Sequence, residues 1–207
     1  MKDPHQEDTT SLYDLHAEEY KSNTEKFVFP GNMFEDFLKY IPWKKVIDVG
    51  CAYGRDMLRM KEKWFHVQGI EISRKLIEIA DLFVQKDIIC ADMTELWEIF
   101  SKETFDWVFA AASILHLEKD LGLDVLKDIF SLLKTGGILF FEAKISSWEQ
   151  TYTELKKSVS LPWKYKKYTL FWEIELDTIL ESFGFSIIKT HKNESQGNIW
   201  KIYICKK

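Results

Sequence analysis

A short loop in the first third of the chain carries the residue types that bind a small anionic ligand. The stretch VIDVGCAYGRD, residues 46–56, passes from an apolar run through an acid to small residues at every second position. Gly50 and Gly54 let the backbone turn sharply and let a ligand approach it closely. The helix that follows such a turn presents free N–H groups and the positive end of its dipole. The loop therefore predicts a site for a carboxylate or a phosphate.

A second acid, about twenty residues further on, narrows the class of ligand. Glu71 ends the next predicted strand, where a carboxylate can accept hydrogen bonds from both hydroxyls of a ribose. The dinucleotide fingerprint G-x-G-x-x-G is absent, because the small residues fall at 50, 52 and 54. Asp48 would repel a pyrophosphate, but it suits a ligand with an ammonium group and a sulfonium. The pattern favours a methionine-bearing nucleoside over NAD.

Two further predicted strands end in small or polar residues. Asp92 follows the third strand, and Ser113 and His116 follow the fourth. Ligands bind outside the carboxyl ends of the strands in open parallel sheets, so we expect these residues to meet in one cleft. His116 could act as a base near neutral pH. The alternative, which we favour, is a packed and hydrogen-bonded histidine beside the ligand.

The elements that must position these residues alternate between apolar strands and amphipathic helices. Strands are predicted at 45–49, 66–72, 87–91, 105–112 and 138–143, and apolar residues at helical spacing mark helices over 55–64, 76–83, 126–133 and 176–183. The segments 185–190 and 198–206 read as an antiparallel pair. This order predicts an α/β fold, a doubly wound and mostly parallel seven-stranded sheet with an antiparallel C-terminal hairpin strand.

Two segments lie outside this alternation in what we expect to be a single domain over residues 1–207. Residues 1–44 are expected to form an N-terminal helical cap that helps to close the cleft. Residues 144–174 are rich in Trp, Tyr and Lys and are expected to form a lid over the substrate site, with lysines facing water. Stacking of nucleic-acid bases on this segment is the alternative.

Composition excludes several classes of function. The net charge of -5 argues against a general nucleic-acid binder. The three cysteines show no CxxC spacing, and the histidines show no metal-ligand spacing, so we expect no disulfide framework and no metal. The chain has no apolar run of about 18 residues, and its polar start does not resemble a signal peptide. We therefore expect a cytoplasmic protein without a membrane span.

Taken together, the motifs resemble those of the class I S-adenosylmethionine-dependent methyltransferases. The resemblance is carried, in the family's order, by VIDVGCAYGRD, VQGIEIS, CADMTEL, FDWVFAAASILHL and LLKTGGILFFEAK. It is closest to a bacterial branch with GRD after the glycine loop and an A-S-x-x-H run after the fourth strand. It implies a Rossmann-like fold, S-adenosylmethionine as cofactor, and methyl transfer to an N, O or S atom of a small-molecule acceptor.

The resemblance also assigns roles by position. The glycine loop would line the methionine part of the cofactor, Arg55 would reach its carboxylate or orient the loop, and Glu71 would hold the ribose. The residues near the acceptor would be Tyr13, Tyr20, Ser113 and Tyr168, with His116 as the candidate catalytic residue. The full set implied for the cofactor is Asp48, Gly50, Cys51, Ala52, Gly54, Arg55, Glu71, Ile72, Asp92, Met93 and Ala110.

Ala52 stands where the family usually has glycine. We expect this turn not to need a positive φ at position 52, so that the extra methyl group costs little. A positive φ would cost about 1 kcal/mol or more, and a degenerate site would then be an alternative.

Other functions stay open beside small-molecule methylation. The acceptor could be RNA or a protein side chain, although AASILH stands where methyltransferases of adenine or cytosine amino groups carry an asparagine-proline tetrapeptide. The chain could also be a scaffold that binds the cofactor without chemistry, or an NAD-linked oxidoreductase.

Overall fold

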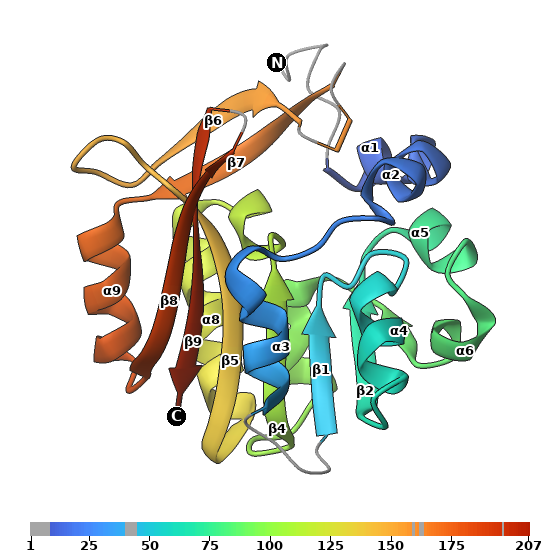
Figure 1. Cartoon of the computed structure of the whole chain (residues 1–207), viewed down its shortest axis with the longest axis horizontal. Helices are drawn as coiled ribbons and strands as arrows, with labels where there is room; N and C mark the ends of the chain where they lie inside the picture. The colour runs from blue at the N-terminus through green and yellow to red at the C-terminus, as the bar shows by residue number, and fades with distance from the viewer. Residues whose placement is uncertain (1–8, 40–44, 159, 162–163, 196) are drawn as a thin grey trace.

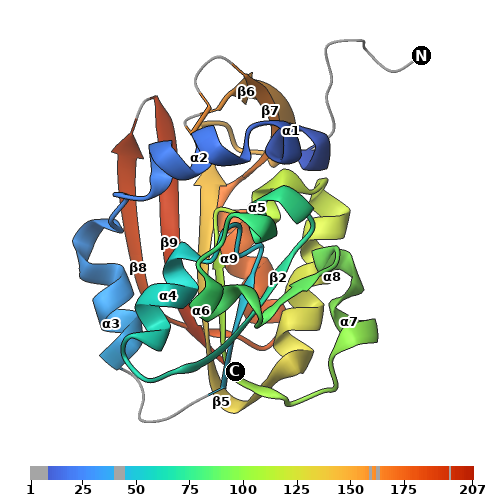
Figure 2. The same cartoon turned by 90° about the vertical axis from the view of Figure 1, so that its right-hand side faces the viewer.

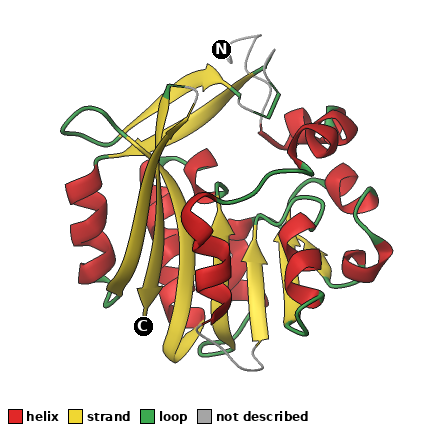
Figure 3. Ribbon diagram, in the orientation of Figure 1, coloured by secondary structure: helices red, strands yellow, loops and turns green. Residues whose placement is uncertain are grey.

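A twisted sheet with helices on both faces forms the frame of the protein (Figures 1 and 3). The structure is a computed structural model, and it describes residues 9–39, 45–158, 160–161, 164–195 and 197–207. Five parallel strands lie in the order β3-β2-β1-β4-β5. Their bounds are β1 Lys45–Val49, β2 His66–Glu71, β3 Ile88–Cys90, β4 Phe105–Ala111 and β5 Leu133–Ile145.

An antiparallel pair completes one side of the sheet. β9 (Asn198–Lys206) runs along β5, and β8 (Ser186–Ser195) runs along β9. The mostly parallel α/β sheet with an antiparallel C-terminal hairpin is thereby confirmed. In the described part of the chain the sheet has nine strands, because β6 (Tyr152–Lys157) and β7 (Tyr165–Phe171) join it from the segment expected to be a lid.

Two apolar cores hold the helices to the two faces. One core packs α8 (Lys119–Leu132) and α9 (Glu173–Ser182) against β4 and β5. In α8, Val125, Leu126, Ile129 and Leu132 recur at helical spacing and are almost fully buried, which explains why this segment is a helix on the sheet. The other core packs α3 (Met33–Lys39) and α4 (Arg55–Lys61) against the opposite face.

The predicted helix over 76–83 is broken in the structure. α5 covers Arg74–Glu78 and α6 covers Leu82–Gln85. Asp81 caps the second helix through a 2.8 Å hydrogen bond from the Phe83 N–H, so the chain restarts there. Phe83, expected on the buried stripe, is half exposed. The short α7 (Leu96–Ile99) packs beside α8.

The β6–β7 hairpin and the N-terminal helices stand above the carboxyl ends of the strands. β7 pairs with β5 only at Lys144–Leu170 and Ile145–Phe171, beyond the point where β4 has ended. α1 (Thr9–Leu15) and α2 (Ala17–Thr24) lie across from this hairpin, over the ends of β1 and β2 (Figures 1 and 2). Residues 1–8 and 40–44 of the expected cap lie outside the described residues.

Candidate functional site

The loops after β1 and β4 meet at the carboxyl edge of the sheet. Gly50 and Gly54 have φ values of 74° and 75°, the left-handed region that glycine adopts without strain. A Cβ atom on Gly50 would lie 2.5 Å from Cβ of Ser113, so a larger residue at position 50 would push the two loops apart. Glycine is therefore required at position 50 by both backbone angle and space.

The expectation for Ala52 is wrong. Its φ is 51°, in the left-handed region. The cause is a specific contact, because this conformation turns the Ala52 N–H toward Glu71 Oε2, 2.9 Å away. Strain of this kind persists where surrounding contacts hold it, and it concentrates at functional sites. The acid that would bind the ribose therefore also fixes the loop.

Glu71 is held in place by the main chain. Besides the Ala52 N–H, its Oε1 accepts a 2.8 Å hydrogen bond from the Ser73 N–H. The side chain is buried, and this burial raises the pKa of the carboxyl even though the backbone donors favour its charged form. A carboxylate has about four lone-pair positions, so these contacts leave room for ligand hydroxyls.

A narrow cavity of about 170 Å³ lies in front of Glu71 and extends beneath α1. Asp92 lies in its wall and caps the short helix Met93–Glu95 through a 2.9 Å hydrogen bond from the Thr94 N–H. Ser113 lies in the same wall with its buried Oγ without a hydrogen-bond partner among the described residues. An unpaired hydroxyl in a cavity wall fits a ligand that supplies the missing partner. The other predicted cofactor residues in this wall are Gly50, Ala52, Ile72 and Met93.

Several predicted cofactor residues lie elsewhere. The Ala110 side chain points into the core with α8, and the next two residues, Ala111 and Ala112, line the cavity instead. Ala112 also has a positive φ of 52°, so strained backbone occurs on both sides of the cleft. Cys51 is buried with its sulfur over Gly69, which agrees with a packing role. Asp48 and Gly54 do not line the cavity, although Asp48 is buried behind it.

Arg55 points away from the narrow cavity. Its guanidinium pairs with Asp56 at 2.6 Å and donates a 3.0 Å hydrogen bond to the Thr24 carbonyl at the end of α2. Asp56 also pairs with Arg59 at 3.0 Å. Arg55 therefore ties α4 to the N-terminal helices, and it lines a second, larger cavity.

This second cavity measures about 530 Å³ and lies between α2, the β6–β7 hairpin and the end of β5. That size is in the range of small-molecule sites. The residues that line both cavities are Tyr13, Tyr20, Ala111, Ala112 and His116. The two cavities therefore face each other across one shared wall. Tyr168, predicted near the acceptor, lines the larger cavity.

His116 is a neutral imidazole in this arrangement. Its Nδ1 lies 3.2 Å from the Lys167 carbonyl, which can only accept, so Nδ1 carries the proton. Its Nε2 then accepts from the Tyr13 hydroxyl at 3.2 Å. Burial is the main cause that lowers the His116 pKa to about 3, and the nearby Lys166 lowers it further. This geometry makes His116 the group that orients Tyr13, and a catalytic role for it stays a prediction.

Sequence reasoning missed three charged residues at the larger cavity. Glu142 lines it, Lys166 lines it from β7, and Lys144 lies behind the Tyr168 and Trp200 rings. The expectation that the lysines of this segment face water is wrong for Lys166, which is only 3% exposed. A signal was present, because two charges interrupt the apolar run ILFFEAKI of β5. Charged side chains are rarely fully buried, so two of them in a buried strand indicate a functional site.

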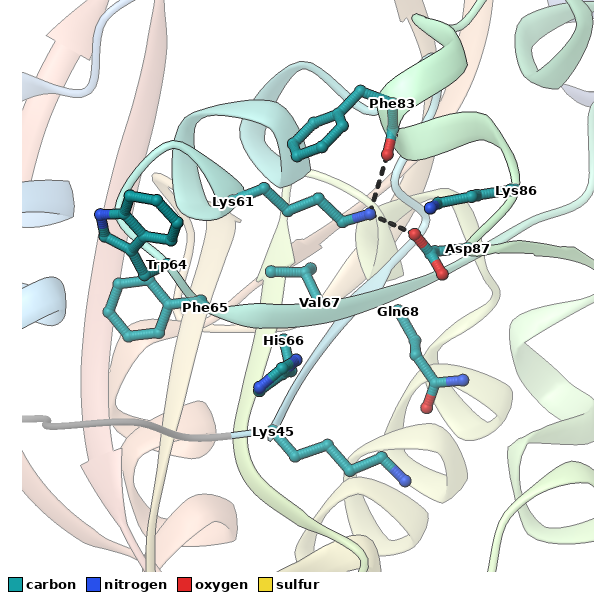
Figure 4. A pocket seen from close by; sticks show the side chains of 10 residues that line it. All are labelled: Lys45, Lys61, Trp64, Phe65, His66, Val67, Gln68, Phe83, Lys86 and Asp87. Carbon is teal, nitrogen blue, oxygen red and sulfur yellow. Dashed lines mark hydrogen bonds and ion pairs between the residues drawn. The ribbon is translucent and has the colours of Figure 1, made fainter.

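A third hollow of about 720 Å³ lies at the opposite, amino end of β1 and β2 (Figure 4). There Lys61 reaches the Phe83 carbonyl at 2.9 Å and pairs with Asp87. It lies away from the strand ends where ligands of this fold class bind, so its larger size does not make it the site. No helix described in the structure is long and apolar enough to cross a membrane. Within the same residues, no cluster of three or more His, Cys, Asp or Glu side chains could hold a metal ion.

Comparison with known proteins assigns the family. Residues 46–137 match the family model described as a methyltransferase domain. These residues form a methyltransferase domain, at the place where the sequence resembles the class I S-adenosylmethionine-dependent methyltransferases. The match contains the glycine loop, Glu71, Asp92 and the turn after β4.

Among curated proteins, the phosphoethanolamine N-methyltransferase of Plasmodium falciparum is 28% identical over 145 residues, 68% of this chain and 53% of that protein. The chain spans between 21% and 53% of the length of the curated relatives it matches. Among solved structures, the 1,6-didemethyltoxoflavin-N1-methyltransferase of Burkholderia thailandensis, with its substrate and S-adenosylhomocysteine bound, has a TM-score of 0.69. It is 17% identical, and the match covers 100% of this chain and 93% of that chain.

A third relative shows that this fold is not confined to methyl transfer. The [4+2]-cyclase SpnF has a TM-score of 0.73 at 16% identity, over 96% of this chain and 95% of that chain. At these identities the two solved structures establish the fold of the methyltransferase domain and leave its reaction to be argued from the site.

Proposed function

We propose that the protein transfers the methyl group of S-adenosylmethionine to an N, O or S atom of a small molecule. The observation that carries the proposal is the wall shared by the two cavities. A cofactor held at Glu71 in the narrow cavity would bring its methyl group to Ala111 and Ala112, where this cavity adjoins the larger one that would hold the acceptor. Such alignment is the main requirement of methyl transfer, since positioning of two reactants can supply about 7–11 kcal/mol.

The residues of the narrow cavity suit the adenosine part of this cofactor. Glu71 would accept from the ribose hydroxyls, Ile72 would lie against the adenine, and Asp92 would accept from the adenine amino group. The unpaired Ser113 hydroxyl faces the same cavity and is available to the ligand. When bound, the cofactor supplies an activated methyl group, so the protein needs mainly to orient the acceptor and exclude water.

The N-terminal helices would exclude water from the two cavities. α1 is fastened over the narrow cavity by a 2.6 Å hydrogen bond from Ser73 Oγ to Asp14 and by the bond between Tyr13 and His116. α2 is fastened to the hairpin side by a 3.0 Å hydrogen bond from Asn23 to the Ser160 carbonyl. A roofed cavity of this size supports a small acceptor over RNA or a folded protein. The phosphoethanolamine N-methyltransferase and the 1,6-didemethyltoxoflavin-N1-methyltransferase, which are both named for small acceptors, also support a small acceptor.

Glu142 is the group best placed to hold a proton that an acceptor gives up. It lines the larger cavity, and its Cα lies beside that of Ala111, a residue of the shared wall, in the β4–β5 register. Burial, with a smaller contribution from Asp56, raises its pKa to about 7, so it can take a proton near neutral pH. An amine or hydroxyl acceptor would pass its proton to this carboxylate as the new bond to the methyl carbon forms.

Calorimetric titration with S-adenosylmethionine and S-adenosylhomocysteine tests the cofactor site. Glu71→Ala should weaken binding about 100-fold or more, because two hydrogen bonds to a charged acceptor contribute roughly 1.5–3 kcal/mol each. Glu71→Gln keeps the shape of the side chain and should show an intermediate loss, whereas the exposed Glu78→Ala should bind as the wild type does. Unchanged affinity in Glu71→Ala would rule out this role.

A metabolite-pool screen for transfer of labelled methyl tests the reaction itself, with Glu71→Ala as the inactive control. Cofactor binding without any methylated product would favour the scaffold or cyclase alternatives. Activity on RNA that falls steeply with salt would favour a nucleic-acid acceptor. We also propose a reducing, cytoplasmic setting, which the three free cysteines support.

A further inference from the structure

Two lysines are buried near the larger cavity, and one of them, Lys166, lines it. Lys144, near the end of β5, is 0% exposed, and Lys166, on β7, is 3% exposed. Lysine is almost never fully buried unless it is paired, because moving an ammonium group out of water costs several kcal/mol. Two such residues at one cavity therefore call for a physical reason.

Aromatic rings and a single hydroxyl provide most of the contacts of these ammonium groups. Lys166 Nζ lies 4.0 Å from the centre of the Tyr13 ring and 3.2 Å from Ser160 Oγ. Lys144 Nζ lies 3.4 Å from the centre of the Tyr168 ring and makes no hydrogen bond to a described residue. Cation–π contacts of this kind contribute only about 0.5–2 kcal/mol each, less than the cost of burial.

The nearby carboxylates do not compensate these charges. Neither Nζ has a carboxylate within ion-pair distance among the described residues. Glu154, whose charge acts on Lys144, pairs with Lys156 at 3.4 Å, and Glu118 pairs with the half-exposed Lys167. The two buried lysines also repel each other, which adds to the effect of burial in lowering the pKa of Lys166 to about 7.

We propose that the methyl acceptor is an acid, with a carboxylate or phosphate group that binds at Lys166 and is attracted by Lys144 behind the Tyr168 and Trp200 rings. This inference rests on the proposed function and names the class of its acceptor. Lys166 lines the larger cavity on the hairpin side, whereas Glu142 lines it next to Ala111, which also lines the cofactor cavity. The acidic end of the acceptor would lie at the hairpin, and its methyl-accepting atom would lie toward Glu142.

Anion binding at Lys166 and Lys144 can be recognised by the protons that the protein takes up. Burial lowers the pKa of Lys144 to about 8, as it lowers that of Lys166. A bound anion stabilises the charged form of a neighbouring lysine and so raises its pKa. Binding at pH 8 should therefore be accompanied by proton uptake, seen as a dependence of the binding enthalpy on the ionisation enthalpy of the buffer.

Matched pairs of probes test the proposal by calorimetry, with and without saturating S-adenosylhomocysteine. Phosphoethanolamine is compared with ethanolamine, β-alanine with 3-aminopropanol, and 4-hydroxybenzoate with 4-hydroxybenzyl alcohol. At least one acidic member should bind about 10-fold or more tightly than its partner, and the pairs separate phosphate from carboxylate preference. Equal binding within every pair, or no binding of the acidic probes at millimolar concentration, would overturn the proposal.

Substitutions separate a ligand role from a structural one. Lys166→Met should weaken binding of the acidic probe about 10-fold or more and remove most of the proton uptake. Its melting temperature should stay at or above that of the wild type, because an uncompensated buried charge is gone. Lys157→Met, on the exposed side of the same hairpin, is the matched control and should bind the probe normally.

The two proposals fail in different ways. If Lys166→Met binds the acidic probe as well as the wild type does, the acidic-acceptor site is wrong. If S-adenosylhomocysteine does not bind to the wild type at all, the methyltransferase function is wrong, and the probe titration on the free protein still decides the anion site.

Discussion

The left-handed conformation of Ala52 is a measurable strain within the cofactor loop. Replacing alanine by glycine at φ 51° removes about 1–2 kcal/mol of strain, against which the greater freedom of glycine in the unfolded chain costs about 0.4–1 kcal/mol. Ala52→Gly should therefore stabilise the protein by about 0.5–1 kcal/mol and raise the melting temperature by about 1–4 °C. Ala111→Gly, in the extended strand β4, should instead destabilise it. A lower melting temperature for Ala52→Gly would show that the strain is not relieved.

The buried carboxyl of Glu142 makes stability depend on pH. Its pKa rises from 4.5, the ordinary value of a glutamate side chain, to about 7 in the folded protein, chiefly through burial. The folded state therefore holds a proton between those values that the unfolded state releases, so the stabilisation present below pH 4.5 is lost as pH rises through 7. Glu142→Gln cannot ionise and should be more stable than the wild type at pH 8, by up to about 3 kcal/mol.

Urea denaturation at pH 4 and pH 8 measures this difference. At pH 4 the two proteins should be equally stable, since both carry a neutral side chain at position 142. Glu181→Gln, an exposed substitution on α9, should show no such pH-dependent gain. A constant difference between Glu142→Gln and the wild type at both pH values would contradict the assignment.

The residues of the cofactor side could be predicted from sequence, whereas the charged residues of the acceptor side could not. The glycine loop, Glu71 and Asp92 follow strand ends, and strand ends meet at one edge of a parallel sheet whatever else the chain does. Lys166 reaches the cavity only because a hairpin joins β5 above the end of β4. The placement of Lys166 depends on the pairing of β7 with β5, which the local spacing of apolar residues does not predict.

The helices and strands also divide into those that could be predicted from sequence and those that could not. Strands β1 to β5 and helices α8 and α9 were predicted, because their apolar residues form short strand-length runs or recur at helical spacing. The β6–β7 hairpin was missed, since YTELKK and YKKYTLF mix charge with aromatic residues and show no clean alternation of exposure. The break between α5 and α6 was missed because the apolar spacing continues through Asp81, whose capping bond overrides it.

In the whole molecule, the N-terminal segment serves two separable purposes. α1 and α2 roof the cavities, with Leu12 and Ala17 as their buried residues. α3 is part of the core, where the Phe37 ring lies 4.0 Å from that of Trp107 and Met33 is fully buried. The site therefore depends on the first two helices, whereas folding depends on the third.

Two truncations test this division. Removal of residues 1–24 should leave a cooperatively folding protein whose affinity for S-adenosylhomocysteine falls about 10-fold or more, because the cofactor would lose its roof. Removal of residues 1–39 also deletes Met33, Phe34 and Phe37, and losing a buried side chain of this size costs about 2–5 kcal/mol each. Their sum matches the whole stability of about 5–15 kcal/mol of a typical domain, so this variant should not fold. Circular dichroism and thermal melting measure whether each variant folds, and calorimetry measures its affinity for S-adenosylhomocysteine. The division would be wrong if the protein without residues 1–39 folded, or if the protein without residues 1–24 bound as the wild type does.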